Sequence, residues 1–349
     1  MTFHIVLPRA MQLGAVADQA ARGECPRHSM GLLADALGAR VHEPDDSRAG
    51  TADRLRAKLA PTESFWVLAR RLKAATGPND VVFFSSEGVG LQFAAVCDDP
   101  VTRPKIVIFA HNLDRPRGRA ALKLWSLRDR VSLFMACSQH QVTFLREYLD
   151  LPAERVRFVW DHTDNRFFTP GPVSADKKRP LLVSVGLEQR DYKTLAEASA
   201  DLPLDVRISG FSKDAAALAL TFPATLPENM SRRFYTWPDL VQLYRDADAV
   251  VVSCRENRYA AGVQSLMEAS ACARPVIATA TQGLASYLDD SVLRVPPGDA
   301  PAMRQAIQAT LAHPAEAARR AERRHQVAAE VYPMDRYVAE IAGALRALA

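Results

Sequence analysis

The sequence predicts an α/β protein made of two doubly wound parallel sheets, one in each half of the chain. Short apolar runs rich in Val and Ile alternate with helical patterns along its 349 residues, which is typical of parallel strands covered by helices on both faces. The chain is also long for a single domain. A segment rich in Pro and charge, TPGPVSADKKRP at 169–180, separates two series of apolar runs, and this composition indicates a linker.

The strands are expected in two series. The first comprises FHIVLP (3–8), VVFF (81–84), KIVIFA (105–110), LFMACS (133–138) and RVRFVW (155–160). The second comprises PLLVSVG (180–186), DVRISG (205–210), AVVVS (249–253) and PVIAT (275–279). We therefore expect an N-terminal domain at 1–170 and a C-terminal domain at 171–333, with a helix at about 334–349 that packs back on the first. Ligands of such folds bind beyond the carboxyl ends of the strands, so we expect a site in the cleft between the domains.

Composition narrows the class of protein. Apolar residues make up 48% and charged residues 24% of the chain, the profile of an ordinary soluble protein. The net charge of +4 is too small to indicate a nucleic-acid partner. The five cysteines form no CxxC pair, which favours a reducing cytosol over a disulfide framework or a zinc site. We recognise no signal-peptide pattern and no apolar run of the ~18 residues that a membrane span needs, and we expect a cytoplasmic protein.

Two patterns approach known cofactor sites without completing them. SSEGVGLQF at 85–93 follows a strand but has Phe93 in the third glycine position of GxGxxG, so a glycine-permitted turn before a helix is favoured over NAD binding. DAD at 246–248 contains two carboxylates but stands where a helix ends before a strand. We therefore expect neither a cofactor nor a bound metal.

One carboxylate, Glu268, interrupts an apolar segment. AAGVQSLMEASACARPVIAT at 260–279 is predicted to be a buried helix that runs into a strand. A buried carboxylate without a partner is costly, so Glu268 needs either a protein group or a ligand.

Three consecutive segments resemble a known family. SVGLEQRDYKTLAEA (184–198), DLVQLYRDADAVVVS (239–253) and AAGVQSLMEASACARPVIATATQGLASYLDD (260–290) are similar to the donor-binding domain of retaining nucleotide-sugar glycosyltransferases of family four (glycosyltransferase group 1). CSQHQVTFLREYLDLPAERVRFVWDHTDNRFFTP (137–170) resembles the segment that closes their first domain. The resemblance implies the GT-B fold, in which two Rossmann-like domains face a cleft, and transfer of a sugar from a nucleoside diphosphate to a hydroxyl acceptor with retention.

The resemblance places the diphosphate near the start of the second domain. Gly186, which ends the first strand of that domain, is expected to be a donor-binding residue. Arg190, in the loop after it, stands where the family usually has a diphosphate-binding Lys, and a guanidinium can hold phosphate oxygens bidentately. Lys193 is a second candidate in that loop. Gly262 and Val263, at the start of the helix that carries the lone carboxylate, are expected to face the phosphates. Each cation has a solvated surface role as its alternative.

The same resemblance assigns the other parts of the donor. Glu268 corresponds to the carboxylate that accepts hydrogen bonds from the ribose hydroxyls, with a structural Glu paired to an Arg as the alternative. Trp237, in RRFYTW at 232–237, is implied to stack on the base or else to be a core aromatic. In the first domain, His111 is implied to be catalytic, in contact with the donor sugar and the reaction centre, or else to be structural.

The sequence indicates residues that contact the acceptor less clearly than residues that contact the donor. Arg27 and His28, in GECPRHSM at 23–30, are expected on the acceptor side or near phosphate. Two departures matter: the family's first Glu, which contacts the transferred sugar, is replaced by Ala260, and its common Arg by Leu187.

Three functions therefore stay open. The first is a glycosyltransferase of glycolipid or polysaccharide biosynthesis. The alternatives are a non-catalytic sugar-nucleotide-binding protein and an epimerase of the same fold. RAALKLWSLRDR at 119–130 is expected to be either a core-packed helix with a solvated basic face or a helix in peripheral contact with an anionic membrane.

Overall fold

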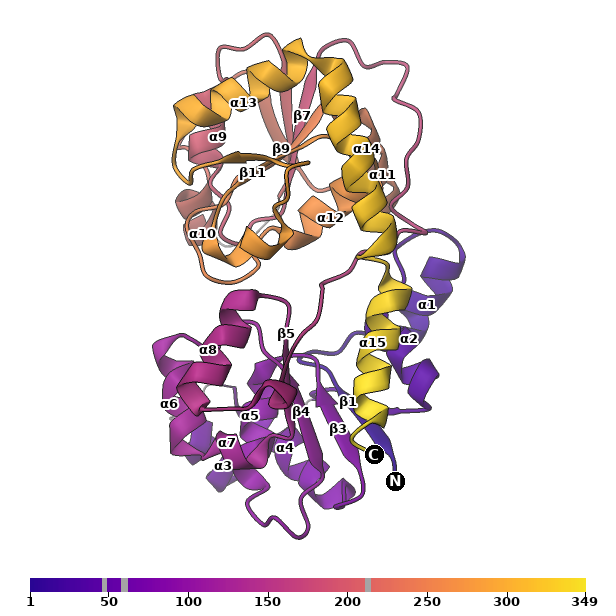
Figure 1. Cartoon of the computed structure of the whole chain (residues 1–349), viewed down its shortest axis with the longest axis vertical. Helices are drawn as coiled ribbons and strands as arrows, with labels where there is room; N and C mark the ends of the chain where they lie inside the picture. The colour runs from indigo at the N-terminus through magenta and orange to yellow at the C-terminus, as the bar shows by residue number, and fades with distance from the viewer. Residues whose placement is uncertain (46–48, 58–61, 211–214) are drawn as a thin grey trace. The chain divides into compact units, whose positions relative to one another are not determined.

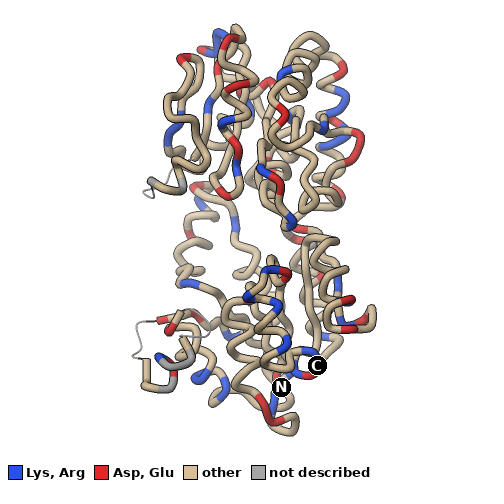
Figure 2. The backbone as a smooth tube through the Cα atoms, turned by 90° about the vertical axis from the view of Figure 1, so that its left-hand side faces the viewer, with Lys and Arg blue, Asp and Glu red and all other residues tan. Residues whose placement is uncertain are grey.

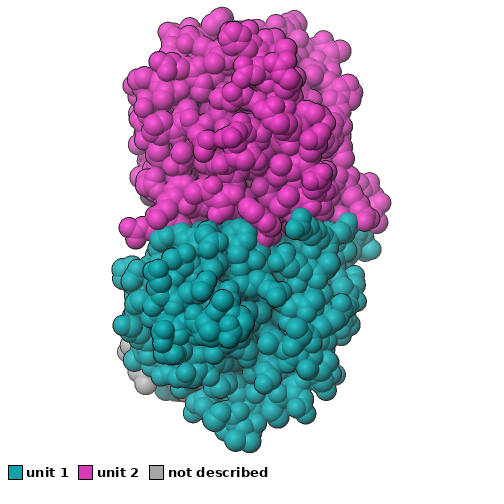
Figure 3. All heavy atoms as spheres, viewed as in Figure 1, with its two compact units in different colours: residues 1–18, 28–159, 335–349 teal, residues 19–27, 160–334 magenta. Residues whose placement is uncertain are grey.

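The computed structural model describes residues 1–45, 49–57, 62–210 and 215–349. They pack as two compact units (Figure 3). The first unit comprises residues 1–18, 28–159 and 335–349, and the second comprises residues 19–27 and 160–334. Each unit contains one six-stranded parallel sheet, as the alternation of apolar runs and helical patterns predicts.

The sheet of the first unit has the order β2-β1-β3-β4-β5-β6, and every neighbouring pair is parallel. Its strands are β1 (Phe3–Val6), β2 (Arg40–His42), β3 (Val81–Phe84), β4 (Lys105–Phe109), β5 (Leu133–Ala136) and β6 (Val156–Phe158). The central strands are buried on both faces, which explains their continuous apolar runs. The sequence missed β2 because this edge strand has three residues and a largely exposed face.

Helices cover both faces of this sheet (Figure 1). They are α2 (Ser29–Leu37), α3 (Thr51–Ala57), α4 (Glu63–Ala75), α5 (Glu87–Val96), α6 (Pro116–Leu124), α7 (Leu127–Arg130), α8 (Gln139–Leu149), the short η1 (Ala153–Arg155) and α15 (Met334–Arg346). Helix α1 (Leu13–Ala21) has no buried residue, and residues 19–21 at its end belong to the second unit. Side chains of α4, α5 and α8 share one core with the sheet. Helices α2 and α15 lie side by side, joined by a hydrogen bond from Arg346 to the Ala36 carbonyl at 2.6 Å.

The glycines at 88 and 90 lie inside a helix rather than in a turn before it. Helix α5 begins at Glu87, so both glycines belong to its first turns. A Cβ on Gly90 would lie 2.9 Å from Ile108 Cγ1 and 3.1 Å from Phe84 Cβ. The glycine therefore allows α5 to pack closely on the sheet, and the predicted turn at this place is wrong.

The predicted continuous helix at 119–130 is also wrong. Helix α6 ends at Leu124, Ser126 has a left-handed backbone with φ of 50°, and α7 begins at Leu127. A single basic face along 119–130 therefore does not form. Within the described residues, no helix combines the length and hydrophobicity that a bilayer span requires.

The basic side chains of this region pack on their own unit. The Arg119 guanidinium lies 5.1 Å from the centre of the Tyr148 ring, and Lys123 Nζ lies 4.8 Å from the same ring. Arg130 donates to the carbonyl of Ala95 at 2.8 Å. Figure 2 shows positive and negative residues interspersed along both units.

The sheet of the second unit has the order β12-β11-β10-β7-β8-β9, all parallel. Its strands are β7 (Leu181–Val185), β8 (Asp205–Ser209), β9 (Met230–Arg233), β10 (Ala249–Val252), β11 (Val276–Thr279) and β12 (Leu293–Val295). Counted within the unit, this is the order 6-5-4-1-2-3 of a Rossmann fold. The strand order reverses between β7 and β10, which is the switch point at which such folds bind ligands.

Helices again cover both faces of the sheet (Figure 1). They are α9 (Tyr192–Ser199), α10 (Ala215–Thr221), α11 (Trp237–Asp246), α12 (Val263–Ala271), the short η2 (Gln282–Tyr287), α13 (Ala300–Ala312) and α14 (Pro314–Glu330). Side chains of α11, α12 and α14 contribute to one core, and those of α9 and α13 to the other.

The carboxylates of the DAD segment hold the chain that precedes β7. Asp246 is the last residue of α11, and its carboxylate accepts from the backbone N–H and the hydroxyl of Ser174 at 2.8 and 2.9 Å. Asp248 accepts from the backbone N–H of Leu181 at 2.7 Å and pairs with Lys177 at 2.7 Å. The interpretation of this segment as the end of a helix is confirmed.

Candidate functional site

Two loops meet at the switch point of the second unit. The loop after β7 and the loop after β10 pair in antiparallel fashion: Asp191 N donates to Ser253 O at 3.0 Å, and Arg255 N donates to Gln189 O at 2.8 Å. Both loops follow the carboxyl ends of their strands. They therefore form the edge at which this class of sheet binds ligands.

Arg190 joins these loops to helix α12. Its side chain is 4% exposed. Nε donates to Val185 O at 2.9 Å, Nη1 to Glu188 O at 3.0 Å and to Cys254 Sγ at 3.4 Å, and Nη2 to Ser265 Oγ at 2.9 Å. Because a guanidinium has five N–H donors, the protein itself takes up most of its hydrogen-bonding capacity.

Two glycines close around this guanidinium. Gly186 and Gly262 have φ of 97° and 95°, a conformation that favours glycine. A Cβ on Gly186 would lie 2.9 Å from Arg190 Nη2, and one on Gly262 would lie 2.6 Å from Val252 Cγ1. Gly262 is the N-cap of α12, and Val263, its first residue, is buried. The structure thus brings four of the predicted residues together.

Glu268 lies two turns further along α12 and has a protein partner. The Tyr244 hydroxyl donates to Glu268 Oε2 at 2.6 Å. Burial raises the pKa of Glu268 to about 7, against the Tyr244 hydrogen bond and the Arg190 charge, which both lower it. No ion pair involves this carboxylate in the described part of the chain, and Oε1 accepts no hydrogen bond there. The alternative of a Glu paired with an Arg is therefore not what the structure contains.

In the described part of the chain, neither Lys193 nor Trp237 has a hydrogen bond or ion pair with Arg190 or Glu268. Lys193 is exposed in the first turn of α9 rather than in the predicted loop. Trp237 begins α11 and is 45% exposed, with its ring 6.4 Å from that of Phe168. It is an accessible aromatic surface, and Phe234, 71% exposed, is a second one three residues earlier.

His111 stands at the carboxyl edge of the first unit's sheet. It is exposed after β4, with Nε2 3.3 Å from Ser85 O. Glu87, in the first turn of α5, accepts from the backbone N–H groups of His111 and Asn112 at 3.1 and 3.2 Å. The sequence analysis missed this carboxylate, which fixes the loop that carries His111.

Arg27 and His28 make contacts that fix the backbone. Arg27 Nη2 lies 2.7 Å from Oδ1 of the buried Asp164, and the Arg27 backbone N–H donates to the same carboxylate. His28 caps α2, where its Nδ1 accepts from the Met30 N–H at 3.2 Å.

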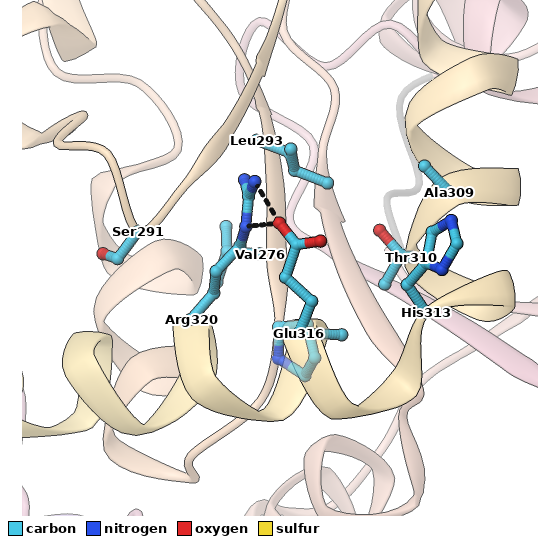
Figure 4. Close-up of a pocket in the computed structure, with 10 residues that line it drawn as sticks. Val276, Ser291, Leu293, Ala309, Thr310, His313, Glu316 and Arg320 are labelled. Carbon is cyan, nitrogen blue, oxygen red and sulfur yellow. Dashed lines mark hydrogen bonds and ion pairs between the residues drawn. The ribbon is translucent and has the colours of Figure 1, made fainter.

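A small cavity of about 50 Å³ lies elsewhere in the second unit (Figure 4). Val276 and Leu293, the first residues of β11 and β12, line it at the amino edge of the sheet. Glu316 and Arg320 face each other there and form an ion pair of 2.7 Å. Its position opposite the switch point excludes it as the main ligand site of this fold. Among the described residues, no group of three or more His, Cys, Asp and Glu is placed to hold a metal ion.

The switch-point residues fall within a region that matches a known family. Residues 179–313 match the family model described as Glycosyl transferases group 1. The search of curated protein sequences gives no match.

Solved structures match along the whole chain. Sucrose-phosphate synthase from Thermosynechococcus elongatus is 17% identical with a TM-score of 0.74, covering 100% of this chain and 99% of its own. HepE from Anabaena in complex with UDP is 14% identical with a TM-score of 0.72, covering 99% and 100%. The α,α-trehalose 6-phosphate synthase from Burkholderia multivorans is 13% identical with a TM-score of 0.73, covering 99% and 98%. The chain therefore has the two-domain GT-B fold, and its similarity to the glycosyl transferases group 1 family is found at residues 179–313.

Proposed function

We propose that this protein is a glycosyltransferase that moves a sugar from a nucleoside diphosphate to a hydroxyl acceptor with retention of configuration. The observation that carries this proposal is the switch-point cluster around Arg190, which lies in the region that matches the group 1 family. The UDP bound by HepE, a protein of the same fold, supports a nucleoside-diphosphate donor.

In this proposal the diphosphate lies at the N-terminus of α12. The positive end of the helix dipole and the backbone at Gly262 and Val263 favour an anion there. Arg190 places a buried positive charge beside this helix start. Because its donors are directed mainly to protein acceptors, Arg190 acts by its charge and by holding the two loops. Lys193 is the proposed second cation.

The nucleoside is proposed to lie between Glu268 and Trp237. One carboxylate oxygen of Glu268 accepts from Tyr244, and the other is proposed to accept from the ribose hydroxyls. The exposed Trp237 offers an aromatic face to the base.

Retention is proposed to follow from attack on the same face that the leaving group departs from. The acceptor oxygen bonds to the anomeric carbon as the bond to the diphosphate breaks, and the hydroxyl proton passes to the leaving phosphate oxygen. His111 is proposed to contact the sugar and stabilise the developing charge, with its loop fixed by Glu87. Cations and a helix N-terminus stabilise the leaving group, so we propose that the enzyme uses neither a metal nor a cofactor.

We further propose that the protein acts in the cytoplasm, in glycolipid or polysaccharide biosynthesis. A second candidate, a sugar-nucleotide-binding protein without activity, is favoured by Ala260 in the place of a sugar-contacting Glu of the family.

A donor panel tests the function. UDP-, GDP- and ADP-sugars are compared by thermal shift, and release of the nucleoside diphosphate is then measured in Mg²⁺ and in EDTA. We expect one base class to raise the melting temperature and turnover to be equal in both buffers. Binding without turnover identifies the binding protein. A loss of turnover in EDTA that Mn²⁺ restores contradicts metal independence.

Trp237→Ala is expected to weaken donor binding about tenfold, because stacking of a base on an aromatic ring contributes roughly 1–3 kcal/mol. The dissociation constant of the donor is measured by calorimetry. Phe234→Ala, which removes the other exposed ring, is the matched control and should leave it unchanged. If Phe234→Ala weakens donor binding and Trp237→Ala does not, the base stacks on Phe234 instead.

A further inference from the structure

The first unit contains a cavity of about 530 Å³ that the proposed chemistry does not yet use. It lies where the N-terminal ends of α4 and α5 meet α6, beside the carboxyl ends of β3 and β4. All of its lining residues belong to the first unit. Its volume is in the range of small-molecule sites.

The lining of this cavity is mostly apolar. Phe65, Leu91, Leu113, Leu124 and Trp125 line it, and Gln92 and Asn112 are polar residues among them. Leu124 is 65% exposed, so the apolar lining continues to the surface. An apolar surface of this kind favours burial of hydrocarbon and gives few hydrogen bonds to sugar hydroxyls.

The mouth of the cavity carries positive charge. Arg115 and Arg117 line it, and both are exposed at the start of α6. The same helix start contributes the positive end of its dipole. Glu87, the one carboxylate among the described residues of the lining, is held by the backbone N–H groups of His111 and Asn112. The side chains at the mouth therefore suit an anionic group.

We propose that this cavity binds the acceptor, and that the acceptor is an amphiphile with an apolar tail and a phosphate-type anionic group. This inference rests on the proposed function. The tail fills the apolar interior and the anion contacts Arg115 and Arg117. Glu87 and Asn112 line the cavity and adjoin His111, so an acceptor bound there presents its hydroxyl beside the proposed catalytic residue.

The test uses the full chain and decyl phosphate below its micelle concentration, titrated by calorimetry. Decyltrimethylammonium has the same tail with the opposite charge, and inorganic phosphate has the anion without a tail. We expect decyl phosphate to bind at least tenfold more tightly than either. Equal affinity for the two detergents, or for decyl phosphate and phosphate, overturns the proposal.

Two variants locate the binding. Ala120→Trp fills the cavity from an exposed position of α6 and should weaken decyl phosphate binding at least tenfold. Arg117→Gln should weaken binding of decyl phosphate about tenfold, because it removes a charge-assisted hydrogen bond to the anion, and it should leave binding of decyltrimethylammonium unchanged. Ala74→Trp and Arg146→Gln, exposed on α4 and α8 away from the lining, are the matched controls and should have no effect.

Donor turnover separates this inference from the proposed function. If the variants keep wild-type affinity for decyl phosphate while the protein still releases nucleoside diphosphate, the cavity proposal fails and the transferase proposal stands. If decyl phosphate binds as expected but no nucleotide sugar binds or turns over, the acceptor role falls together with the transferase.

Discussion

Arg190→Ala is expected to destabilise the second unit by roughly 3 kcal/mol or more and to lower kcat/KM for the donor about a hundredfold. The substitution removes the hydrogen bonds to Val185 O, Glu188 O, Cys254 Sγ and Ser265 Oγ, of which the last two are buried, and a hydrogen bond to a charged group contributes about 1.5–3 kcal/mol. It also releases the β7 loop from the N-terminus of α12, where the diphosphate is proposed to bind. Urea unfolding and donor kinetics measure the two effects.

Three variants separate the roles of Arg190. Arg190→Lys keeps the positive charge but loses the planar set of guanidinium N–H donors. If Arg190 positions the two loops, this variant should restore little of the kcat/KM lost in Arg190→Ala. Full restoration would show that only the charge matters. The cost of Arg190→Ala should be less than additive with Ser265→Ala, because the two share a hydrogen bond. Arg294→Ala, which removes an exposed ion pair with Asp290, should change stability by less than about 1 kcal/mol. If Arg294→Ala lowers the free energy of unfolding as much as Arg190→Ala does, the effect is not specific to Arg190.

Glu268→Gln is expected to remove a pH dependence of stability of about 3 kcal/mol. Burial raises the pKa of Glu268 from its ordinary value of 4.5 to about 7, so folding favours the protonated carboxyl. The stability from this group is fully present below pH 4.5 and is lost as the pH rises through about 7. Gln stays neutral, so the free energy of unfolding of the variant should increase relative to that of the wild type as the pH rises. Parallel pH profiles of the two proteins would mean that Glu268 does not titrate as inferred.

Tyr244→Phe should move the Glu268 titration to higher pH, because the Tyr244 hydroxyl donates to the carboxylate and lowers its pKa. The midpoint of the stability profile is measured by urea unfolding at a series of pH values. This variant is the matched control for Glu268→Gln, since it changes the midpoint without removing the titrating group.

The same ionisation should control donor affinity. Ribose hydroxyls donate to the ionised carboxylate, so wild-type affinity should fall up to tenfold per pH unit below about 7. The affinity of Glu268→Gln should be about tenfold lower or more at pH 8 and independent of pH. A donor without the 2′-hydroxyl should lose the same contact as the Glu268→Gln variant. If the losses of binding free energy caused by the mutation and by the missing hydroxyl are strictly additive, Glu268 does not contact that hydroxyl.

The strands and the switch point were predictable because buried parallel strands leave continuous apolar runs. The helix at Val263–Ala271 and the strand at Val276–Thr279 follow from one segment of small and apolar residues. The strands β2, β9 and β12 were not predicted, because each contains basic residues and is largely exposed or only partly buried, which leaves no continuous apolar run. The break between α6 and α7 at Ser126 was not predicted, because the residues at 119–130 are all compatible with a helix.

The residues of the site were predictable only as far as single loops. The sequence places Arg190 after Gly186, but its contact with Ser265 joins residues 75 positions apart. Tyr244 lies in the apolar stripe of α11 beside the buried Leu240 and Leu243, so its pattern predicts a core residue. That its hydroxyl meets Glu268 depends on how α11 and α12 pack, which no local pattern encodes.

The exchange of segments between the units has a consequence for how the protein is made. Because residues 19–27 pack with the second unit and residues 335–349 with the first, neither unit corresponds to one uninterrupted stretch of the gene. On the ribosome, the first unit cannot acquire α15 until the whole second unit has been translated, so the usual N-terminal-first order of domain completion is reversed here. A fragment that stops at Val159 would leave Phe109 without its contact to Tyr337. Cutting the chain there would also separate residues 19–27 from the unit with which they pack, so truncation at a single point does not divide this protein into its two units.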